Sequence, residues 1–263
     1  AALIGLDYDG PAWEEYLNQF TVEELAGLLS DNFGTTEITS VGKPAVVAGD
    51  GPDGVGGTYS EKQYGTSVQD TCFPTEIVLA ATFNKDLMYN RGKLMANECM
   101  YLGIEEDWMP GINLHRTPFG GRNFEYFAED GKMCGYFVAY AVKGCTENGV
   151  YAYAKHFAGN DSDEGRNGQF KWMTEQSLRE IWAKPGELAV KIGKANAFMI
   201  SVISCSGFCD GCVVRSLAKA FPASVGKSQT SPLMEPFSDG FQIFRLPALS
   251  LYLMGDFSLW VLL

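Results

Sequence analysis

Short apolar runs alternate with amphipathic stretches along much of the chain. The apolar runs have the length of β-strands and lie at residues 43–49, 104–109, 150–157 and 197–200. Between them, hydrophobic residues recur with helical spacing at residues 84–102, 131–142 and 174–192. This alternation predicts parallel β-α-β units, and the apolar strands predict a sheet that is covered on both faces.

Local signals mark the ends of several helices. Thr21 and Glu24 form the Thr-x-x-Glu pattern of a capping box, which predicts a helix that opens there. Gly103 is expected to end the helix at 84–102. Pro185 is expected to break or kink the helix at 174–192. In the helix at 84–102, the repeat runs through Leu87, Met88, Arg91, Leu94, Met95 and Glu98.

Polar or bulky residues follow the predicted strands at their carboxyl ends: Asp50, Trp108, Lys155 with His156, and Ser201. Polar residues often begin loops, so one such strand end would be uninformative. Several of them together indicate a site, because the carboxyl ends of parallel barrel strands carry the active site.

Lys155 and His156 are adjacent at the end of the strand at 150–157. Successive side chains of a regular strand point to opposite faces, so a regular strand cannot aim both at one ligand. We therefore expect a local distortion, either a bulge or a non-proline cis peptide bond, at or next to this pair.

Composition narrows the classes of protein. The chain has 263 residues, of which 46% are hydrophobic, enough for one large core or two small ones. Its formal net charge of -12 argues against a nucleic-acid partner. Seven scattered cysteines argue against a disulfide-stapled secreted domain. The chain begins with Ala and shows no leader pattern, and we favour a fragment over a processed protein. Its location stays open, with a slight preference for the bacterial cytoplasm.

The pattern is lost after Ser201. Residues 202–263 are rich in Ser and Pro and show no alternation of helix and strand. We therefore divide the chain into residues 1–201 and an atypical tail, residues 202–263, which is expected to come from a shifted reading frame or a chimeric join. The nearly apolar end contains Asp256, which disfavours a membrane span.

Several common sites are excluded or disfavoured. Gly226, Lys227 and Ser228 resemble the end of a P-loop, but Phe221 stands where the motif needs Gly. The glycine-rich GDGPDGVGG lacks the dinucleotide-binding pattern. Three cysteines of the tail lack a fourth zinc ligand nearby, so no metal is predicted; they are Cys205, Cys209 and Cys212. No cofactor is predicted either.

The remaining polar residues suit a neutral, hydroxyl-rich ligand, because Asp accepts hydrogen bonds from hydroxyls while Lys and Arg donate them. They are Asp50, Arg122, Lys155, His156, Asn160 and Arg166. Trp108 could stack on the apolar face of a sugar. Ordinary structural roles stay open: Arg122 could form an ion pair with Glu125, and Arg166 could be a solvated loop charge.

Five segments together carry a resemblance to a family: GDGPDGV, FPTEIVLAATFN, PGINLHRTPFGGRNFEYFAED, KHFAGNDSDEGRN and EQSLREIWAKPGELAVK. From about residue 15 to residue 201, the chain resembles the N-terminal domain of glycoside hydrolase family 3. Within that family it is most similar to the bacterial β-glucosidases. The resemblance implies a (β/α)8-type (TIM-like) barrel, incomplete in this chain. It also implies retaining hydrolysis of terminal, non-reducing β-D-glycosyl residues. The implied sugar-binding residues are Asp50, Arg122, Lys155, His156 and Arg166.

The chain departs from the family at its catalytic residues. The family nucleophile is an Asp after a later barrel strand, and the acid/base usually lies in a following domain. Asp239 is the nearest imitation of the nucleophile, but it follows Pro236 and not a β-branched run. Gly56 also stands where the family often has Arg.

We therefore expect a truncated β-glucosidase-like chain that lacks its catalytic carboxylates. Its expected partners are a β-linked glucoside or related oligosaccharide and the missing C-terminal domains, with no nucleic acid and no membrane. Two alternatives stay open: a non-catalytic sugar-binding module, and a decayed fragment without a stable fold.

Overall fold

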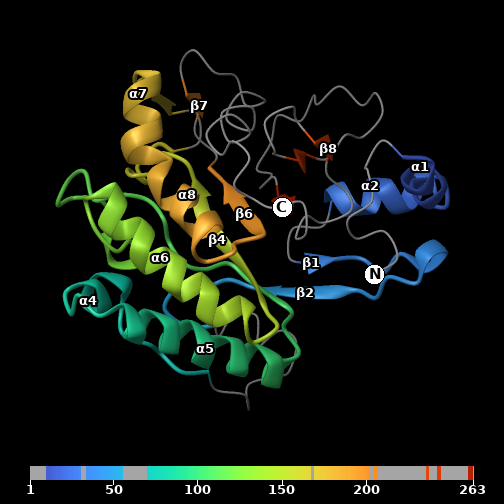
Figure 1. The fold of residues 1–263 in the computed structure, drawn as a ribbon, viewed down its shortest axis with the longest axis horizontal. Helices are drawn as coiled ribbons and strands as arrows, with labels where there is room; N and C mark the ends of the chain where they lie inside the picture. The colour runs from blue at the N-terminus through green and yellow to red at the C-terminus, as the bar shows by residue number, and fades with distance from the viewer. Residues whose placement is uncertain are drawn as a thin grey trace.

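The computed structural model describes residues 10–30, 34–55, 70–166 and 169–201, together with four short strands beyond them (Figure 1). Its largest sheet has the strand order β1-β2-β3-β4-β6-β10. These strands are Gly34–Thr35 (β1), Val46–Gly49 (β2), Glu106–Asp107 (β3), Tyr151–Phe157 (β4), Ala197–Ile200 (β6) and Trp260–Leu262 (β10).

The four central strands β2, β3, β4 and β6 are parallel, and their order in the sheet is the order in which they occur along the chain. Strands β1 and β10 pair antiparallel at the two edges. The predicted β-α-β arrangement is therefore confirmed over residues 46–200, and the mixed sheet corresponds to an incomplete (β/α)8 barrel.

Strand β3 is shorter than the predicted run at 104–109, because Glu106 and Asp107 alone form its regular ladder. Strand-like hydrogen bonds continue on both sides of it. Glu105 N donates to Val47 O at 3.1 Å, and Trp108 N donates to Gly49 O at 3.1 Å. Residues 105–108 thus run alongside β2 for longer than the two residues of β3.

Three helices cover one face of the parallel strands: Lys85–Leu102 (α5), Gly131–Thr146 (α6) and Lys184–Lys191 (α8). Helix α6 lies between the other two and packs against both (Figure 1). Helix α5 ends at Gly103, whose φ is 69°, as predicted. Close packing of α5 on α6 requires Gly92, because a Cβ atom there would lie 2.1 Å from Ala141 O.

The predicted helix at 174–192 is broken just before Pro185. It consists of a short turn at Glu175–Ser177 (α7), a π-helical turn at Leu178–Trp182 (η3), and α8. Pro185 lies in the first turn of α8, where the missing N–H of proline costs no helical hydrogen bond.

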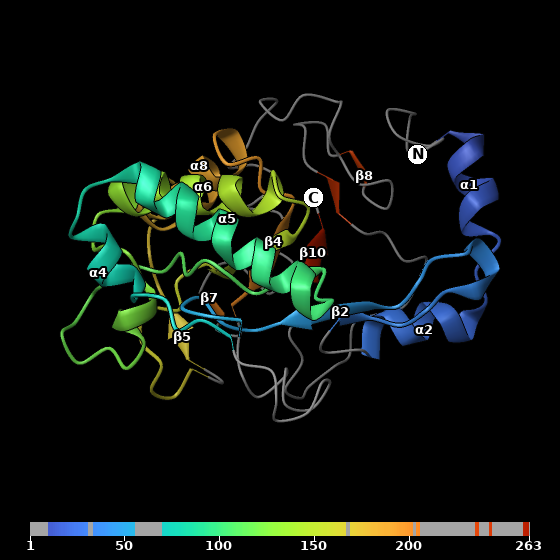
Figure 2. The ribbon, with the colours of Figure 1, turned by 90° about the horizontal axis from the view of Figure 1, so that it is seen from below.

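The N-terminal helices Pro11–Leu17 (α1) and Val22–Ser30 (α2) lie at the opposite end of the molecule from Glu76–Ala80 (α4) (Figure 2). The capping box at α2 is confirmed. Thr21 N donates to Glu24 Oε2 at 2.9 Å, and Glu24 N donates to Thr21 Oγ1 at 3.2 Å.

Short elements complete the described chain. They are the 3-10 turns Thr39–Val41 (η1) and Asn123–Glu125 (η2), the parallel pair Phe170–Lys171 (β5) and Ser204–Cys205 (β7), and the antiparallel pair Glu235–Pro236 (β8) and Gln242–Ile243 (β9).

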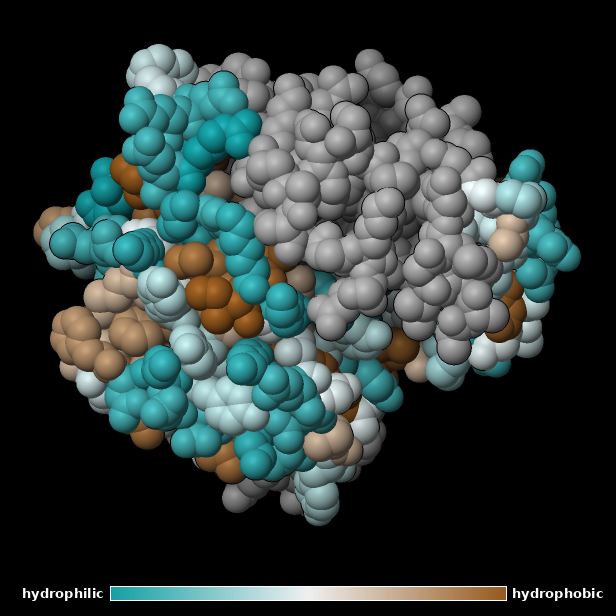
Figure 3. All heavy atoms as spheres, in the orientation of Figure 1, coloured by the Kyte–Doolittle hydropathy of each residue, from teal (hydrophilic) through white to brown (hydrophobic). Residues whose placement is uncertain are grey.

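The main core lies between the sheet and helices α5, α6 and α8. On α5 the buried face includes Met88, Arg91 and Met95, whereas Leu87 and Leu94 are 41% and 51% exposed. The helical repeat predicted from the sequence for this helix therefore includes residues from both its buried and its exposed face. On the face seen in Figure 3, the coloured surface is mainly hydrophilic with small apolar patches. In the described segments, no helix combines the length and apolar character of a membrane span.

Candidate functional site

The carboxyl ends of the four parallel strands meet at one edge of the sheet. Asp50 directly follows β2, Trp108 follows β3, Lys155 and His156 lie near the end of β4, and Ser201 follows β6. The predicted convergence of these strand ends is confirmed.

Strand β4 is distorted where Lys155 and His156 lie. The peptide bond between them is cis, and the pairing with β6 shifts register between Lys155 and Phe157. The predicted local distortion is therefore confirmed. Both side chains are buried, with Lys155 2% and His156 5% exposed.

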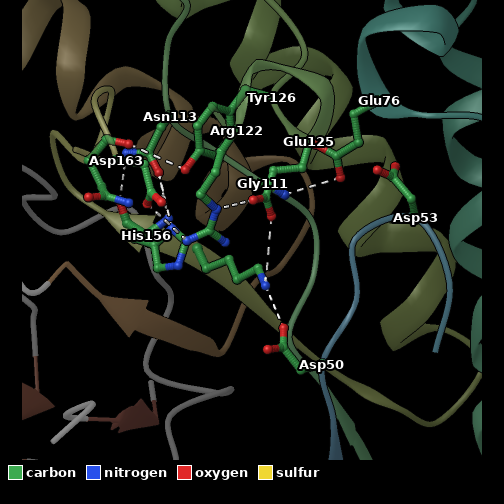
Figure 4. Close-up of polar contacts among 12 residues, drawn as sticks. Asp50, Asp53, Glu76, Gly111, Asn113, Arg122, Glu125, Tyr126, His156 and Asp163 are labelled. Atoms are coloured by element: carbon green, nitrogen blue, oxygen red, sulfur yellow. Dashed lines mark hydrogen bonds and ion pairs between the residues drawn. The ribbon is translucent and has the colours of Figure 1, made fainter. Parts of the chain in front are cut away.

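Six charged side chains of alternating sign form a continuous series, which we call the ion chain. In order, its members are Asp50, Lys155, Glu125, Arg122, Asp163 and Arg166. They come from the loop after β2, from η2 and the residue before it, from β4, and from the loop after β4. Figure 4 labels four of them: Asp50, Glu125, Arg122 and Asp163.

The Asp50 half of the ion chain is centred on Lys155. Its Nζ donates to Asp50 Oδ1 at 2.5 Å and lies 3.8 Å from Glu125 Oε2. Glu125 is 3% exposed and lies between Lys155 and Arg122, whose Nε donates to Glu125 Oε1 (Figure 4). A buried carboxylate between two cations holds both in place, since each buried charge needs a partner.

The Arg122 half reaches toward solvent. Arg122 Nη1 lies 3.7 Å from Asp163 Oδ1, which accepts from Arg166 Nη1 at 2.9 Å. The side chains of Asp163 and Arg166 are 37% and 40% exposed. The ion pair between Arg122 and Glu125 that the sequence suggested is therefore present, whereas Arg166 is partly exposed but paired with Asp163.

His156 is oriented by Asn113. Asn113 Oδ1 accepts from His156 N at 2.9 Å, while Asn113 Nδ2 donates to His156 O at 2.9 Å. His156 Nδ1 lies 3.4 Å from the same Oδ1. Because that amide oxygen can only accept, the contact requires the proton on Nδ1 and leaves Nε2 as an acceptor.

Burial, followed by the positive charges of Arg122, Lys155 and Arg166, lowers the pKa of His156 well below its ordinary value. The imidazole is therefore neutral at pH 7, and it can accept one hydrogen bond at Nε2.

A second buried carboxyl lies beside this site. Asp107 is fully buried at the end of β3. Burial raises its pKa to about 7, with the charge of Lys155 opposing and that of Asp50 adding to the shift. Burial and then the charge of Asp107 raise the pKa of the Cys145 thiol on α6.

Two further residues of the predicted set are buried. Trp108 is 4% exposed and packs with Ala48, Tyr153 and Ala197, so its ring faces protein and has little surface left for a sugar. Asn160 is 2% exposed, and its backbone oxygen accepts from Tyr126 Oη at 3.3 Å.

Sequence reasoning gave no central role to Glu125 and missed Asn113. Glu125 had one signal, its place three residues after Arg122. Asp239, the residues of the P-loop-like segment, and Cys209 and Cys212 lie outside the described residues. Within the described segments, no group of His, Cys, Asp or Glu side chains is arranged to hold a metal ion.

Comparison with known proteins identifies the family. The profile of the glycosyl hydrolase family 3 N terminal domain matches residues 27–227, extending past the boundary predicted at Ser201. A β-glucosidase of Kluyveromyces marxianus is 38% identical over 180 residues, which cover 68% of this chain and 21% of that protein. A putative β-glucosidase of Schizosaccharomyces pombe is 34% identical and covers 74% of this chain and 23% of that protein.

Solved structures agree. The K. marxianus β-glucosidase in complex with glucose superposes with a TM-score of 0.67 and 36% identity, over 74% of this chain and 23% of that one. β-Glucosidase 3B of Thermotoga neapolitana, also in complex with glucose, gives 0.67 and 32%, over 74% of this chain and 30% of that one. The chain therefore spans less than a third of the length of these relatives, and it belongs to glycosyl hydrolase family 3.

Proposed function

We propose that this chain binds the terminal, non-reducing β-D-glucosyl unit of a β-glucoside at the ion chain. The main support for this proposal is the ion chain. It places carboxylate acceptors beside lysine and arginine donors where the parallel strands have their carboxyl ends. Two related β-glucosidases are described in complex with glucose, which supports the same choice of ligand.

The side chains divide the proposed work. Asp50 accepts from sugar hydroxyls, and its 35% exposed side chain leaves it accessible. Lys155 and Arg122 donate to hydroxyl oxygens, exchanging part of their ion-pair contacts for sugar contacts. Neutral His156 accepts a hydrogen bond from a sugar hydroxyl at Nε2, and Arg166 donates from the outer end of the ion chain.

The proposed reaction is retaining hydrolysis by the whole protein to which these residues belong. Retention requires a nucleophilic carboxylate and an acid/base carboxyl about 5–5.5 Å apart. In the described site, Asp50, Glu125 and Asp163 all form ion pairs, so none is offered as the nucleophile. We propose that this chain alone does not hydrolyse glucosides and that the missing carboxyls belong to other parts of the full enzyme.

The proposal also covers the tail, residues 202–263. Asp239, the nearest imitation of the family nucleophile, follows Pro236, which lies in the two-residue strand β8. We propose that residues 1–201 are the barrel portion and that residues 202–263 derive from a shifted frame or a chimeric join. Translation of the source DNA in the other two frames tests the idea. It fails if neither frame continues the family pattern after codon 201.

Titration with glucose, followed by tryptophan fluorescence, tests binding. Lys155→Met should weaken glucose binding about tenfold or more, the value of one charge-assisted hydrogen bond. Lys143→Met is the matched control, because Lys143 pairs with Glu147 on the exposed face of α6. Equal glucose affinity in Lys155→Met and wild type would refute the proposed site.

Hydrolysis of an aryl β-glucoside tests the chemistry. No turnover is expected, and turnover that survives Asp239→Asn would contradict our account of the missing nucleophile. A second candidate function, sugar binding without hydrolysis even in the full-length protein, is favoured by the ion pairs of Asp50, Glu125 and Asp163. Glucose binding without turnover in the intact gene product would select it.

A further inference from the structure

A second buried ionic cluster lies behind the ion chain. Arg91 of α5 is 3% exposed, and it contacts two carboxylates. Its Nη2 lies 3.0 Å from Asp53 Oδ1, and its Nη1 lies 3.4 Å from Glu76 Oε1. Figure 4 shows Glu76 and Asp53 beside Gly111, on the side of Glu125 away from His156.

One arm of this cluster holds the loop that carries Asp50. Asp53 lies three residues after Asp50 in the turn at 50–55. Its side chain is held by Arg91, and its backbone oxygen accepts from Phe73 N at 2.9 Å. The short loop is thus fixed to α5 and to the segment that leads into α4.

The other arm holds the strand that carries Lys155. Glu76 Oε1 accepts from Gly111 N at 3.1 Å. The segment at 110–112 runs along Lys155: Lys155 N donates to Pro110 O at 3.0 Å, and Ile112 N donates to Lys155 O at 2.6 Å. Glu76 therefore fixes the backbone neighbour of Lys155.

The two arms meet at the guanidinium of Arg91, and the Asp53 carboxylate also accepts from the backbone N–H of Glu76. Two carboxylates face one cation, and burial, opposed by the charge of Arg91, raises the pKa of both Glu76 and Asp53. A positive charge of any shape would not be enough to hold both carboxylates in place. A planar guanidinium can contact two carboxylates with separate nitrogens, whereas an ammonium is a single point charge.

We propose that Arg91 is a positioning residue of the sugar site: by bridging Asp53 and Glu76, it sets the Asp50 loop relative to the Lys155 strand and so maintains the 2.5 Å contact between Asp50 and Lys155. The effect of Arg91 on glucose affinity rests on the proposed function, whereas its effect on the position of the backbone does not.

Hydrogen exchange of the full chain without sugar measures the backbone effect directly. Arg91→Met should speed exchange of the Phe73 and Lys155 amides about tenfold or more, the value of one charge-assisted hydrogen bond. The amide of Val138, inside α6, should keep its wild-type rate. Arg91→Lys, which keeps the charge but loses the two-armed contact, should give an intermediate rate.

A glucose titration follows on the same variants. The dissociation constant should rise about tenfold in Arg91→Met and less in Arg91→Lys. Arg179→Met is the matched control, because Arg179 pairs with Glu175 on an exposed helix turn, and neither measurement should change.

Each outcome decides the inference. Wild-type exchange at Phe73 and Lys155 in Arg91→Met would overturn it. Equal acceleration at Val138 in both Arg91 variants would also overturn it, by showing a general loss of stability. If Arg91→Met does not fold, the same comparison on Arg91→Lys decides. If wild type binds no glucose, the proposed function fails while the exchange data still test the positioning.

Discussion

The buried carboxyl of Asp107 should make the stability of this chain depend on pH. Burial raises its pKa from 3.8 to about 7 in the folded chain. The fold therefore favours the protonated acid. Stability from this group is fully present below the unfolded pKa and is lost as the pH rises through the folded pKa. The difference between the two pKa values sets a ceiling of about 4 kcal/mol on that loss.

Asp107→Asn removes this ionisation while keeping a similar shape. Urea unfolding at about pH 5 and about pH 8 measures the free energy of unfolding of both proteins. At the lower pH, Asp107→Asn should already be more stable than wild type by about 1–2 kcal/mol, because the carboxyl of the unfolded chain is ionised there. At the higher pH, this difference should grow by about 2–3 kcal/mol, toward the ceiling of about 4 kcal/mol. Other buried acids, such as Asp161, are shared by both proteins and cancel in the comparison.

Glu164→Gln is the control, because Glu164 is exposed in the loop after β4. It should leave the pH dependence unchanged. If the stability difference between Asp107→Asn and wild type were the same at both pH values, Asp107 would not ionise in this range, and the reasoning from burial would be refuted.

Three further predictions concern packing, capping and protonation. Gly92→Ala should cost about 1–3 kcal/mol in urea unfolding, because the new methyl would meet the backbone of Ala141, whereas Gly121→Ala meets no atom within 4 Å and serves as its control. Thr21→Ala should cost about 1 kcal/mol by removing the side-chain half of the capping box, and an unchanged urea midpoint would contradict that role. The His156 imidazole should stay neutral well below pH 6.5 by NMR, and the free energy of unfolding should fall as the pH drops through the lowered pKa of His156. Titration of His156 near pH 6.5 would contradict the effect of burial and of the neighbouring cations on its pKa.

The sequence carried enough local information for the parallel sheet and its helices. The capping box at Thr21, the stop at Gly103 and the break at Pro185 all act within a few residues, so they could be identified without tertiary contacts. The distortion at Lys155 and His156 was also predictable, because two polar residues that adjoin in a strand cannot both face one site under regular alternation.

Other features depend on contacts between distant segments. Arg91 occupies the buried face of α5 only because Asp53 and Glu76 arrive from elsewhere to pair with it. Periodicity alone placed it in the same repeat as Leu87 and Leu94, which are partly exposed. A charged residue within an otherwise buried stripe was the available signal, but its partners could not be named from spacing.

The ion chain also has an electrical consequence. Its three carboxylates and three cations sum to zero formal charge, although the whole chain carries a net charge of -12. An uncharged ligand can enter this locally neutral patch without displacing salt ions, so its affinity should hardly vary with ionic strength. A sugar acid would leave one charge uncompensated, and a sugar phosphate nearly two. The site is thus equipped to discriminate between ligands by charge as well as by hydroxyl pattern.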